Sequence, residues 1–135
     1  MTVSLKGVGA ITLFVEDLPG SKLFYQDVLG LRVIFEDENS AAFDFDNSII
    51  NLLSIRAARE LIQPGAVASP EAGSRFQLTI WVADADAACA ELDARGVALL
   101  NGPMNRDWGM RTASFTDPAG NIWEIAQNLS SADDA

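Results

Sequence analysis

The sequence predicts an α+β fold made of two βαβββ modules, and two observations lead to it. A pattern of one strand, one helix and three short strands occurs twice, and a segment rich in Ala, Pro and Gly separates the two copies. With 135 residues, 49% of them apolar, the chain can form one domain with a hydrophobic core. We expect a single domain at 1–128, with modules at about 7–55 and 76–127, a linker at 56–75 and a disordered tail at 129–135.

The first module begins with a strand whose side chains alternate between two sets. These sets are Ile11, Leu13 and Val15 on one side and Ala10, Thr12 and Phe14 on the other. A helix follows, in which Asp17 suits the N-cap, Phe24 and Val28 lie one turn apart, and Gly30 suits the C-terminal cap. The three remaining strands are expected at 31–37, 40–46 and 49–55.

The second module has the same order of elements. Its first strand alternates Leu78, Ile80 and Val82 with Gln77, Thr79 and Trp81. Asp84 suits the N-cap of the helix and Gly96 its end, and Cys89 shares one helical face with Ala85 and Leu92. Three strands are expected at 97–103, 110–117 and 122–127, with a loop at 101–109 and a turn at the sequence DPAGN.

The linker at 56–75 has room for one helical turn at 57–62. A flexible connection of this length is unusual inside a compact domain, and it would let the modules pair within one chain or across two. We therefore expect a homodimer.

Charge and composition exclude several classes of function. Nine basic against nineteen acidic residues give a net charge of -10, which argues against nucleic acid as a partner. No apolar run approaches about 18 residues and the start MTVSLKGVGA lacks a signal-peptide core, so we expect a cytoplasmic protein without a membrane partner. An acidic surface would attract cationic ligands, although solubility explains the charge more simply.

Histidine is absent, and Cys89 is the only cysteine. The absence of histidine removes the commonest general base, the commonest metal ligand and every Ser-His or Cys-His nucleophile. A single cysteine cannot form an intramolecular disulfide, and its apolar helical face predicts a packing role for Cys89.

Glu124 interrupts an apolar run in the last strand. Removing an ionised carboxylate from water costs roughly several kcal/mol unless it is compensated, so this position must be wet, paired or functional. Strand alternation turns Glu124 away from Trp123 and Ile125, which suit the packed face. Matching the two modules places Asn51 at the position equivalent to Glu124.

Three polar side chains, Asn51, Gln77 and Glu124, are thus predicted to lie on one concave surface. The rest of this surface would be lined by Ala10, Thr12, Phe14, Thr79 and Trp81. A mostly apolar surface with a few polar groups is typical of a site for a small-molecule ligand. The alternative is that the three polar side chains bond one another or water at a sheet edge.

The stretches ITLFVEDLPGSKLFYQDVLGL and WGMRTASFTDPAGNIWEI resemble the vicinal oxygen chelate superfamily, which includes glyoxalase I, the bleomycin-resistance proteins and the extradiol dioxygenases. The resemblance covers nearly everything from Val8 to Gln127, and DPAGNIWEI is its most specific part. It implies paired βαβββ modules that form a curved mixed sheet shaped as a cup, commonly in a dimer.

In metal-dependent members of this superfamily the ligands come from the first and last strands of each module. According to the resemblance, the corresponding positions in this sequence are Ala10, Asn51, Gln77 and Glu124. Only Glu124 is the usual carboxylate, and Ala10 stands at a lost ligand position because alanine cannot bind a metal. The resemblance therefore implies either no cofactor or a divalent metal bound weakly by Glu124, Gln77 and Asn51.

The stretch RDWGMRTASFTDPAGN is also similar to the corresponding part of bleomycin-resistance proteins, which bind their drug without chemistry and lack the metal ligands. Trp108, Trp81 or Phe14 would stack on planar rings of a ligand. Trp108 has a second interpretation, packing on a partner subunit, and Arg111 is best explained by a structural ion pair.

Two hypotheses about function follow. The first is a metal-independent protein that binds a small organic ligand in the cup, oriented by Glu124, Gln77 and Asn51, with Thr79 and the aromatic residues in contact. The second is a glyoxalase-like lyase or isomerase in which Glu124 is the catalytic base or a metal ligand. An extradiol dioxygenase is disfavoured, because its iron needs imidazole ligands.

Overall fold

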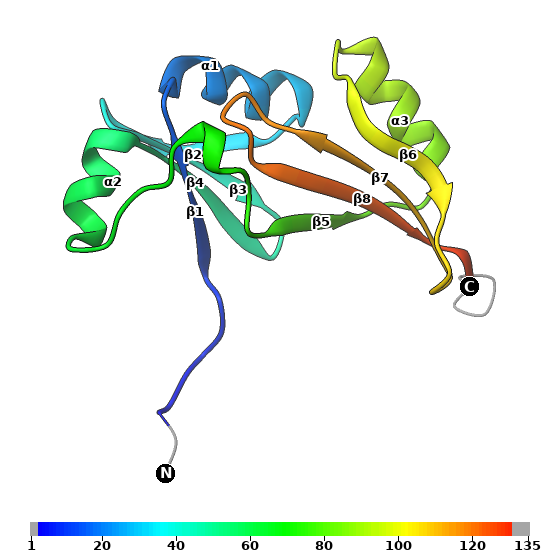
Figure 1. Cartoon of the computed structure of the whole chain (residues 1–135), viewed down its shortest axis with the longest axis horizontal. Coiled ribbons are helices and arrows are strands. Elements are labelled where there is room, and N and C mark those ends of the chain that lie inside the picture. Colours follow the sequence, from blue (N-terminus) through cyan, green and yellow to red (C-terminus); the bar gives the residue numbers. More distant parts are fainter. Residues whose placement is uncertain (1–2, 131–135) are drawn as a thin grey trace. The chain divides into compact units, whose positions relative to one another are not determined.

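The computed structural model describes residues 3–130 and confirms the α+β fold (Figure 1). The chain divides into two compact units between Ala68 and Ser69, inside the predicted linker. Each unit contains a mixed four-stranded sheet, with strand order β1-β4-β3-β2 in the first and β5-β8-β7-β6 in the second. The same βαβββ topology therefore occurs twice.

The first unit follows the predicted order of elements. Its elements are β1 (Ala10–Val15), α1 (Leu18–Leu23), η1 (Phe24–Val28), β2 (Arg32–Glu36), β3 (Ser40–Phe45), β4 (Ser48–Ser54) and α2 (Ile55–Ile62). Strand β1 pairs with β4 in parallel, whereas β2, β3 and β4 pair antiparallel. Leu13 and Val15 are buried, as the alternation predicted.

The first helix begins at its predicted cap, since Asp17 Oδ1 accepts a 3.1 Å hydrogen bond from the backbone N–H of Gly20. The second half of the helix, η1, is a π-turn, and Tyr25 is its fully buried residue, with its ring 5.8 Å from that of Phe43. Phe24 and Val28 are only half-buried, because the wider turn changes which side chains face the sheet.

The predicted linker contains more structure than expected. Its first part is α2, a helix of 8 residues that contacts β1 and β4, with Ala58 fully buried. The hydroxyl of Ser54 caps this helix at the N–H of Ala57, 3.5 Å away. This helix is therefore longer than the single turn expected at 57–62. A turn of 3-10 helix, η2 (Pro70–Ala72), follows later in the linker.

The second unit repeats the first. Its elements are β5 (Gln77–Trp81), α3 (Ala85–Ala94), β6 (Leu99–Asn105), β7 (Met110–Thr116) and β8 (Ile122–Asn128). Strand β5 pairs with β8 in parallel, and β6, β7 and β8 pair antiparallel. Asp84 caps α3 by accepting a 3.1 Å hydrogen bond from the N–H of Ala87, as predicted. Among residues 3–130 no helix is long and apolar enough to cross a membrane.

Helix α3 covers one face of the second sheet. It contacts β6, β7 and β8, and Figure 1 shows it beside β6 and β7. Ala85, Cys89 and Leu92 are buried on the helix, and Trp123 and Ile125 are buried on β8. The predicted packing role of Cys89 is confirmed.

The segment predicted as a loop at 101–109 is mostly strand. Residues 101–105 belong to β6, and the connection is reduced to the turn at 106–109, where the N–H of Gly109 bonds the carbonyl of Arg106 at 3.1 Å. An edge strand with irregular register tolerates both Gly102 and Pro103, because Pro103 need not donate to a ladder and Gly102 adopts a φ of 83°.

The disordered tail was predicted to begin at residue 129, but residues 129 and 130 form hydrogen bonds. The backbone N–H of Leu129 donates to the carbonyl of Gly109 at 2.9 Å, and that of Ser130 donates to the side chain of Asn128 at 3.0 Å. Residues 129 and 130 are therefore held against the second sheet. The rest of that prediction, 131–135, lies outside the described residues.

Candidate functional site

One face of the second sheet packs on α3, and the other face points away from this helix. The side chain of Gln127 accepts a 2.9 Å hydrogen bond from the first N–H of α3, at Ala85, so Gln127 lies on the helix side. Because side chains alternate along a strand, Glu124 lies on the opposite side. We call this second side of the sheet the open face.

A row of polar side chains crosses the middle of the open face. Glu124 is paired in register with Thr79 on β5 and with Ser114 on β7, and Ser114 is paired with Asn101 on β6. The hydroxyl of Thr79 donates a 2.9 Å hydrogen bond to Oε1 of Glu124. This bond fixes one oxygen of a half-exposed carboxylate, and the second oxygen can accept further donors.

Gln77 and Trp81 lie on either side of this row. Gln77 is paired in register with Ile122 and Trp81 with Ala126, so both share the open face with Glu124. Both side chains are exposed, Trp81 by 72%. The second sheet thus combines a carboxylate, an amide and a large aromatic surface.

The first sheet carries the equivalent positions without the charge. Asn51 is paired in register with Thr12, and its Nδ2 lies 3.4 Å from the Thr12 hydroxyl oxygen, to which it donates. Ala10 and Phe14 lie on the same face, paired with Ile49 and Leu53. Asn51 belongs to the first unit, so its convergence with Gln77 and Glu124 on one surface stays a prediction.

The family resemblance implies four metal-ligand positions. The side chains at these positions do not fit a tightly bound metal. No group of three or more His, Cys, Asp or Glu residues within 3–130 is arranged to hold an ion. Ala10 offers only a methyl group, Asn51 and Gln77 offer neutral amides, and one oxygen of Glu124 already accepts from Thr79. A tight divalent site normally has more anionic or imidazole ligands than one carboxylate.

Arg106 is a residue of the open face that the sequence analysis did not identify. Its Nε donates a 2.9 Å hydrogen bond to the hydroxyl of Thr112, and its Nη2 donates to the side-chain oxygen of Asn101 at 3.3 Å. Its guanidinium carbon lies 6.0 Å from the ring centroid of Trp108. Arg106 is the first residue of the stretch RDWGMRTASFTDPAGN, but it was not singled out, because the segment around it was interpreted as a loop.

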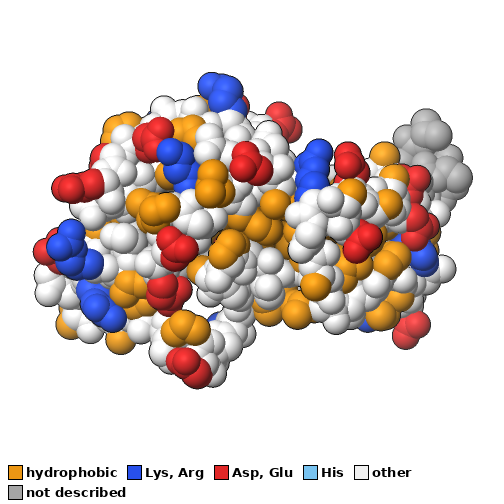
Figure 2. Space-filling view, turned by 90° about the horizontal axis from the view of Figure 1, so that it is seen from above, with side chains coloured by type: hydrophobic (Ala, Val, Ile, Leu, Met, Phe, Trp, Pro, Cys, Tyr) orange, Lys and Arg blue, Asp and Glu red, His pale blue; other side chains and the backbone are white. Residues whose placement is uncertain are grey.

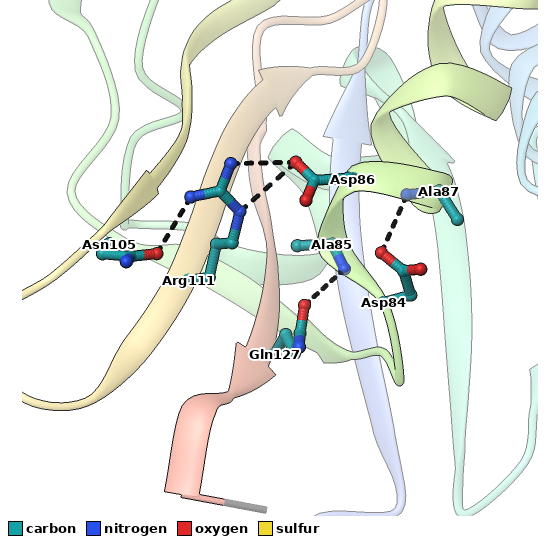
Figure 3. A network of polar contacts seen from close by, with 7 residues as sticks. All are labelled: Asp84, Ala85, Asp86, Ala87, Asn105, Arg111 and Gln127. Atoms are coloured by element: carbon teal, nitrogen blue, oxygen red, sulfur yellow. Dashed lines mark hydrogen bonds and ion pairs between the residues drawn. The ribbon is translucent and has the colours of Figure 1, made fainter.

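Arg111 lies on the other side of β7 and has the predicted structural role (Figure 3). Its Nη2 donates to Oδ1 of Asp86 on α3 at 2.9 Å, and its Nη1 donates to Asn105 on β6, also at 2.9 Å. The hydrogen bond that Arg111 donates to the carboxylate of Asp86 raises the pKa of Arg111 above its already high value. Arg111 therefore ties the helix to the sheet and does not reach the open face.

The charge of the chain is spread over its surface. Figure 2 shows acidic side chains scattered across the visible face, with a few Lys and Arg between them. The net charge of -10 thus forms no single binding patch on that face.

Comparison with known proteins finds relatives over nearly the whole chain. The sequence model of the Glyoxalase/Bleomycin resistance protein/Dioxygenase superfamily matches residues 7–125. The uncharacterized protein YraH of Bacillus subtilis (strain 168) is 37% identical over 123 residues, which cover 88% of this chain and 96% of that protein.

Solved structures have the same architecture. A glyoxalase/bleomycin resistance protein/dioxygenase from Nocardioides superposes with a TM-score of 0.85 and 27% identity, over 95% of this chain and 87% of the other. TnmS3, an antibiotic binding protein from Streptomyces sp. CB03234, superposes with a TM-score of 0.72 and 24% identity, over 94% and 98%. The likeness to TnmS3 concerns the fold alone.

Proposed function

The chain belongs to the glyoxalase/bleomycin resistance protein/dioxygenase superfamily, and we propose that it binds a small organic ligand on the open face of its second sheet without a tightly held metal. One observation carries this proposal. The carboxylate of Glu124 is held by Thr79 on the face away from α3, whereas the other three ligand positions implied by the resemblance hold one alanine and two neutral amides.

Glu124 would act as the anchor of the ligand. With Oε1 bonded to Thr79, its other oxygen accepts a hydrogen bond from an N–H or O–H group of the ligand. Gln77, on the same face, can both donate and accept, and the exposed ring of Trp81 provides apolar contact. This combination of few polar groups and apolar surface is common in ligand sites.

The antibiotic-binding neighbour supports the proposal only through its fold. It indicates that paired βαβββ modules can accommodate an organic molecule. The identity of the ligand of the present chain has to be found by experiment.

The proposal is tested by a thermal-shift screen with a panel of cationic, neutral and anionic aromatic compounds. We expect at least one compound to raise the melting temperature, because a ligand that binds only the folded state stabilises it. Glu124→Gln should reduce this rise in melting temperature. Glu91→Gln, which changes an exposed side chain on α3, should not. A panel that shifts neither the wild type nor the variants would count against ligand binding.

Metal content is measured on the same preparation. We expect less than one equivalent of metal per chain and an unchanged melting temperature after addition of a chelator. A stoichiometric divalent ion whose removal lowers the melting temperature would overturn the metal-independent part of the proposal.

A second candidate function, a glyoxalase-like lyase or isomerase, is favoured by the half-exposed position of Glu124. In an isomerisation, Glu124 would take a proton from a hydroxyl-bearing carbon next to a carbonyl, which gives an enediolate, and return it to the former carbonyl carbon. A proton would move at the same time from the hydroxyl oxygen to the former carbonyl oxygen, so that the carbonyl group changes place. The assay is turnover of the methylglyoxal–glutathione adduct, with and without added divalent metal. A rate that disappears in Glu124→Gln supports this function, and no rate under either condition removes this substrate.

We also propose that the chain forms a homodimer. Large apolar side chains are exposed in both units, among them Phe35, Trp81 and Trp108. A second copy would shield such surface from water. The mass in solution, measured by light scattering, distinguishes a monomer of 14.5 kDa from a dimer.

A further inference from the structure

The guanidinium group of Arg106 is held in a defined position on the open face. It donates to the hydroxyl of Thr112 on β7 and to the amide oxygen of Asn101 on β6, at 2.9 and 3.3 Å. Thr112 is 1% exposed, so its hydroxyl is a well-fixed partner. Arg106 is itself half-buried and lies beside the ring of Trp108.

All the interactions of this guanidinium are with neutral groups. Arg32, Arg95 and Arg111 each have a carboxylate within 4.0 Å, but within residues 3–130 no carboxylate forms an ion pair with Arg106. Arg56, Arg59 and Arg75 also have no carboxylate partner among the described residues, but these three are exposed, whereas Arg106 is half-buried. The positive charge is therefore oriented but not neutralised by the described part of the chain.

Arg106 also has donors to spare. A guanidinium carries five N–H groups, and the two hydrogen bonds to Thr112 and Asn101 occupy two of them. The remaining N–H groups retain the planar geometry that binds a carboxylate or a phosphonate through two oxygens.

The position of this charge relative to Glu124 follows from the sheet register. Glu124 pairs with Ser114, and Ser114 pairs with Asn101, the residue that Arg106 contacts. Neighbouring strands lie about 4.8 Å apart, so Glu124 and Asn101 are roughly 10 Å apart along this row. A small aromatic molecule with polar groups at both ends is long enough to reach from Glu124 to Arg106.

We propose that Arg106 recognises an anionic group of the ligand, and that the ligand is a small aromatic anion with a hydrogen-bond donor at its other end. The donor would bond Glu124, the anion would bond Arg106, and the ring would lie across Ser114 near Trp108. This inference rests on the proposed ligand-binding function and adds the chemical class of the ligand to it.

A purely structural role for Arg106 predicts something different. Its hydrogen bonds would then only hold the turn at 106–109 against β7, and its replacement would lower stability without changing the preference among ligands. The discriminating measurement is the ratio of affinities for a charged and an uncharged probe of the same shape.

The experiment uses the full chain and three probes: 4-hydroxybenzoate, 4-hydroxybenzamide and methyl 4-hydroxybenzoate. Binding is measured by quenching of tryptophan fluorescence and by calorimetry. We expect the carboxylate to bind about tenfold more tightly than the two neutral probes, because a hydrogen bond between two charged groups is stronger than one between neutral groups.

Three variants complete the test. Arg106→Met should abolish the preference for the carboxylate, and Arg106→Lys, which keeps the charge but loses the planar donors, should retain part of it. Arg95→Met is the matched control at the C-terminal end of α3, on the other side of the sheet, and should leave the preference unchanged. Melting curves identify any variant that fails to fold. If Arg106→Met does not fold, the preference of Arg106→Lys for the carboxylate tests the role of Arg106.

The outcomes separate the two proposals. Equal affinity of the wild type for the carboxylate and the amide would overturn the role of Arg106 and leave ligand binding standing. Failure of all three probes to bind would also overturn this inference, whereas the broader thermal-shift screen would still decide whether the protein binds any ligand. A preference that survives in Arg106→Met would assign the anion to another residue.

Discussion

Thr79 and Glu124 face each other across the parallel strands β5 and β8, where the threonine hydroxyl donates a 2.9 Å hydrogen bond to the carboxylate. The first sheet has the same pairing between Thr12 and Asn51, but there the amide of Asn51 is the donor, at 3.4 Å. The two modules thus keep one backbone geometry, and only the second places a negative charge on it.

Thr79→Val should weaken ligand binding while the fold is retained. Thr79 is an exposed positioning residue, and losing its hydrogen bond to Glu124 should reduce affinity about fivefold, which corresponds to roughly 1 kcal/mol. Calorimetry with a compound found in the thermal-shift screen measures this effect. Thr116→Val, on the same face and paired with Ile122, is the control, and an equal loss in both variants would contradict the role of Thr79.

Gly102→Ala should destabilise the second unit strongly. A Cβ at Gly102 would come within 2.3 Å of the carbonyl oxygen of Thr112 and 2.7 Å of Cα of Ala113, and the φ of 83° adds strain. We expect a loss of roughly 2–4 kcal/mol in the free energy of unfolding, measured with urea. Gly109→Ala has a similar φ but open space around its Cβ, so about 1 kcal/mol is expected there.

A similar loss in the two glycine variants would contradict this prediction. It would mean that the positive φ, which both glycines share, and not the close approach of β6 to β7, makes Gly102 necessary.

Cys89 should react slowly with thiol reagents in the folded protein. Burial raises the pKa of its thiol, and the negative charge of Asp86 raises it further against the opposing effect of Arg111. The thiolate is the reactive form, so less of it is present at a given pH than in an unfolded chain. Labelling with 5,5′-dithiobis(2-nitrobenzoate) at pH 8 should become fast only in denaturant, and fast labelling of the native protein would show an open helix face.

Asp37 should make the free energy of unfolding depend on pH. The N–H of Asn39 and the hydroxyl of Ser40 donate to its carboxylate and hold its pKa below the ordinary value of about 3.9. Because the pKa is lowered on folding, this stabilisation is fully present above about pH 4 and is lost as the pH falls through the folded value.

The measurement compares the wild type with Asp37→Asn by urea unfolding at several pH values. The wild type should be the more stable protein at pH 6, and the difference should shrink as the pH falls below 4. A difference that is independent of pH would assign the effect to hydrogen bonding rather than to ionisation.

The repeated fold was predictable because its signals are local. The alternation of side chains in strands and the caps at Asp17 and Asp84 each depend on a few neighbouring residues, and the structure retains them. The same reasoning did not identify Tyr25 as a core residue, and it interpreted residues 104 and 105 as loop. A π-turn and an irregular edge strand depend on packing against distant residues, which a local pattern does not contain.

The sequence alone determined that Glu124 points away from the packed face, since Trp123 and Ile125 on either side of it require burial and strand alternation has a period of two. Only the tertiary structure decided which groups surround this carboxylate and which cation shares its face. Thr79 and Arg106 reach their places through strand register and a hairpin turn, and these join residues far apart in the chain whose pairing no local pattern specifies.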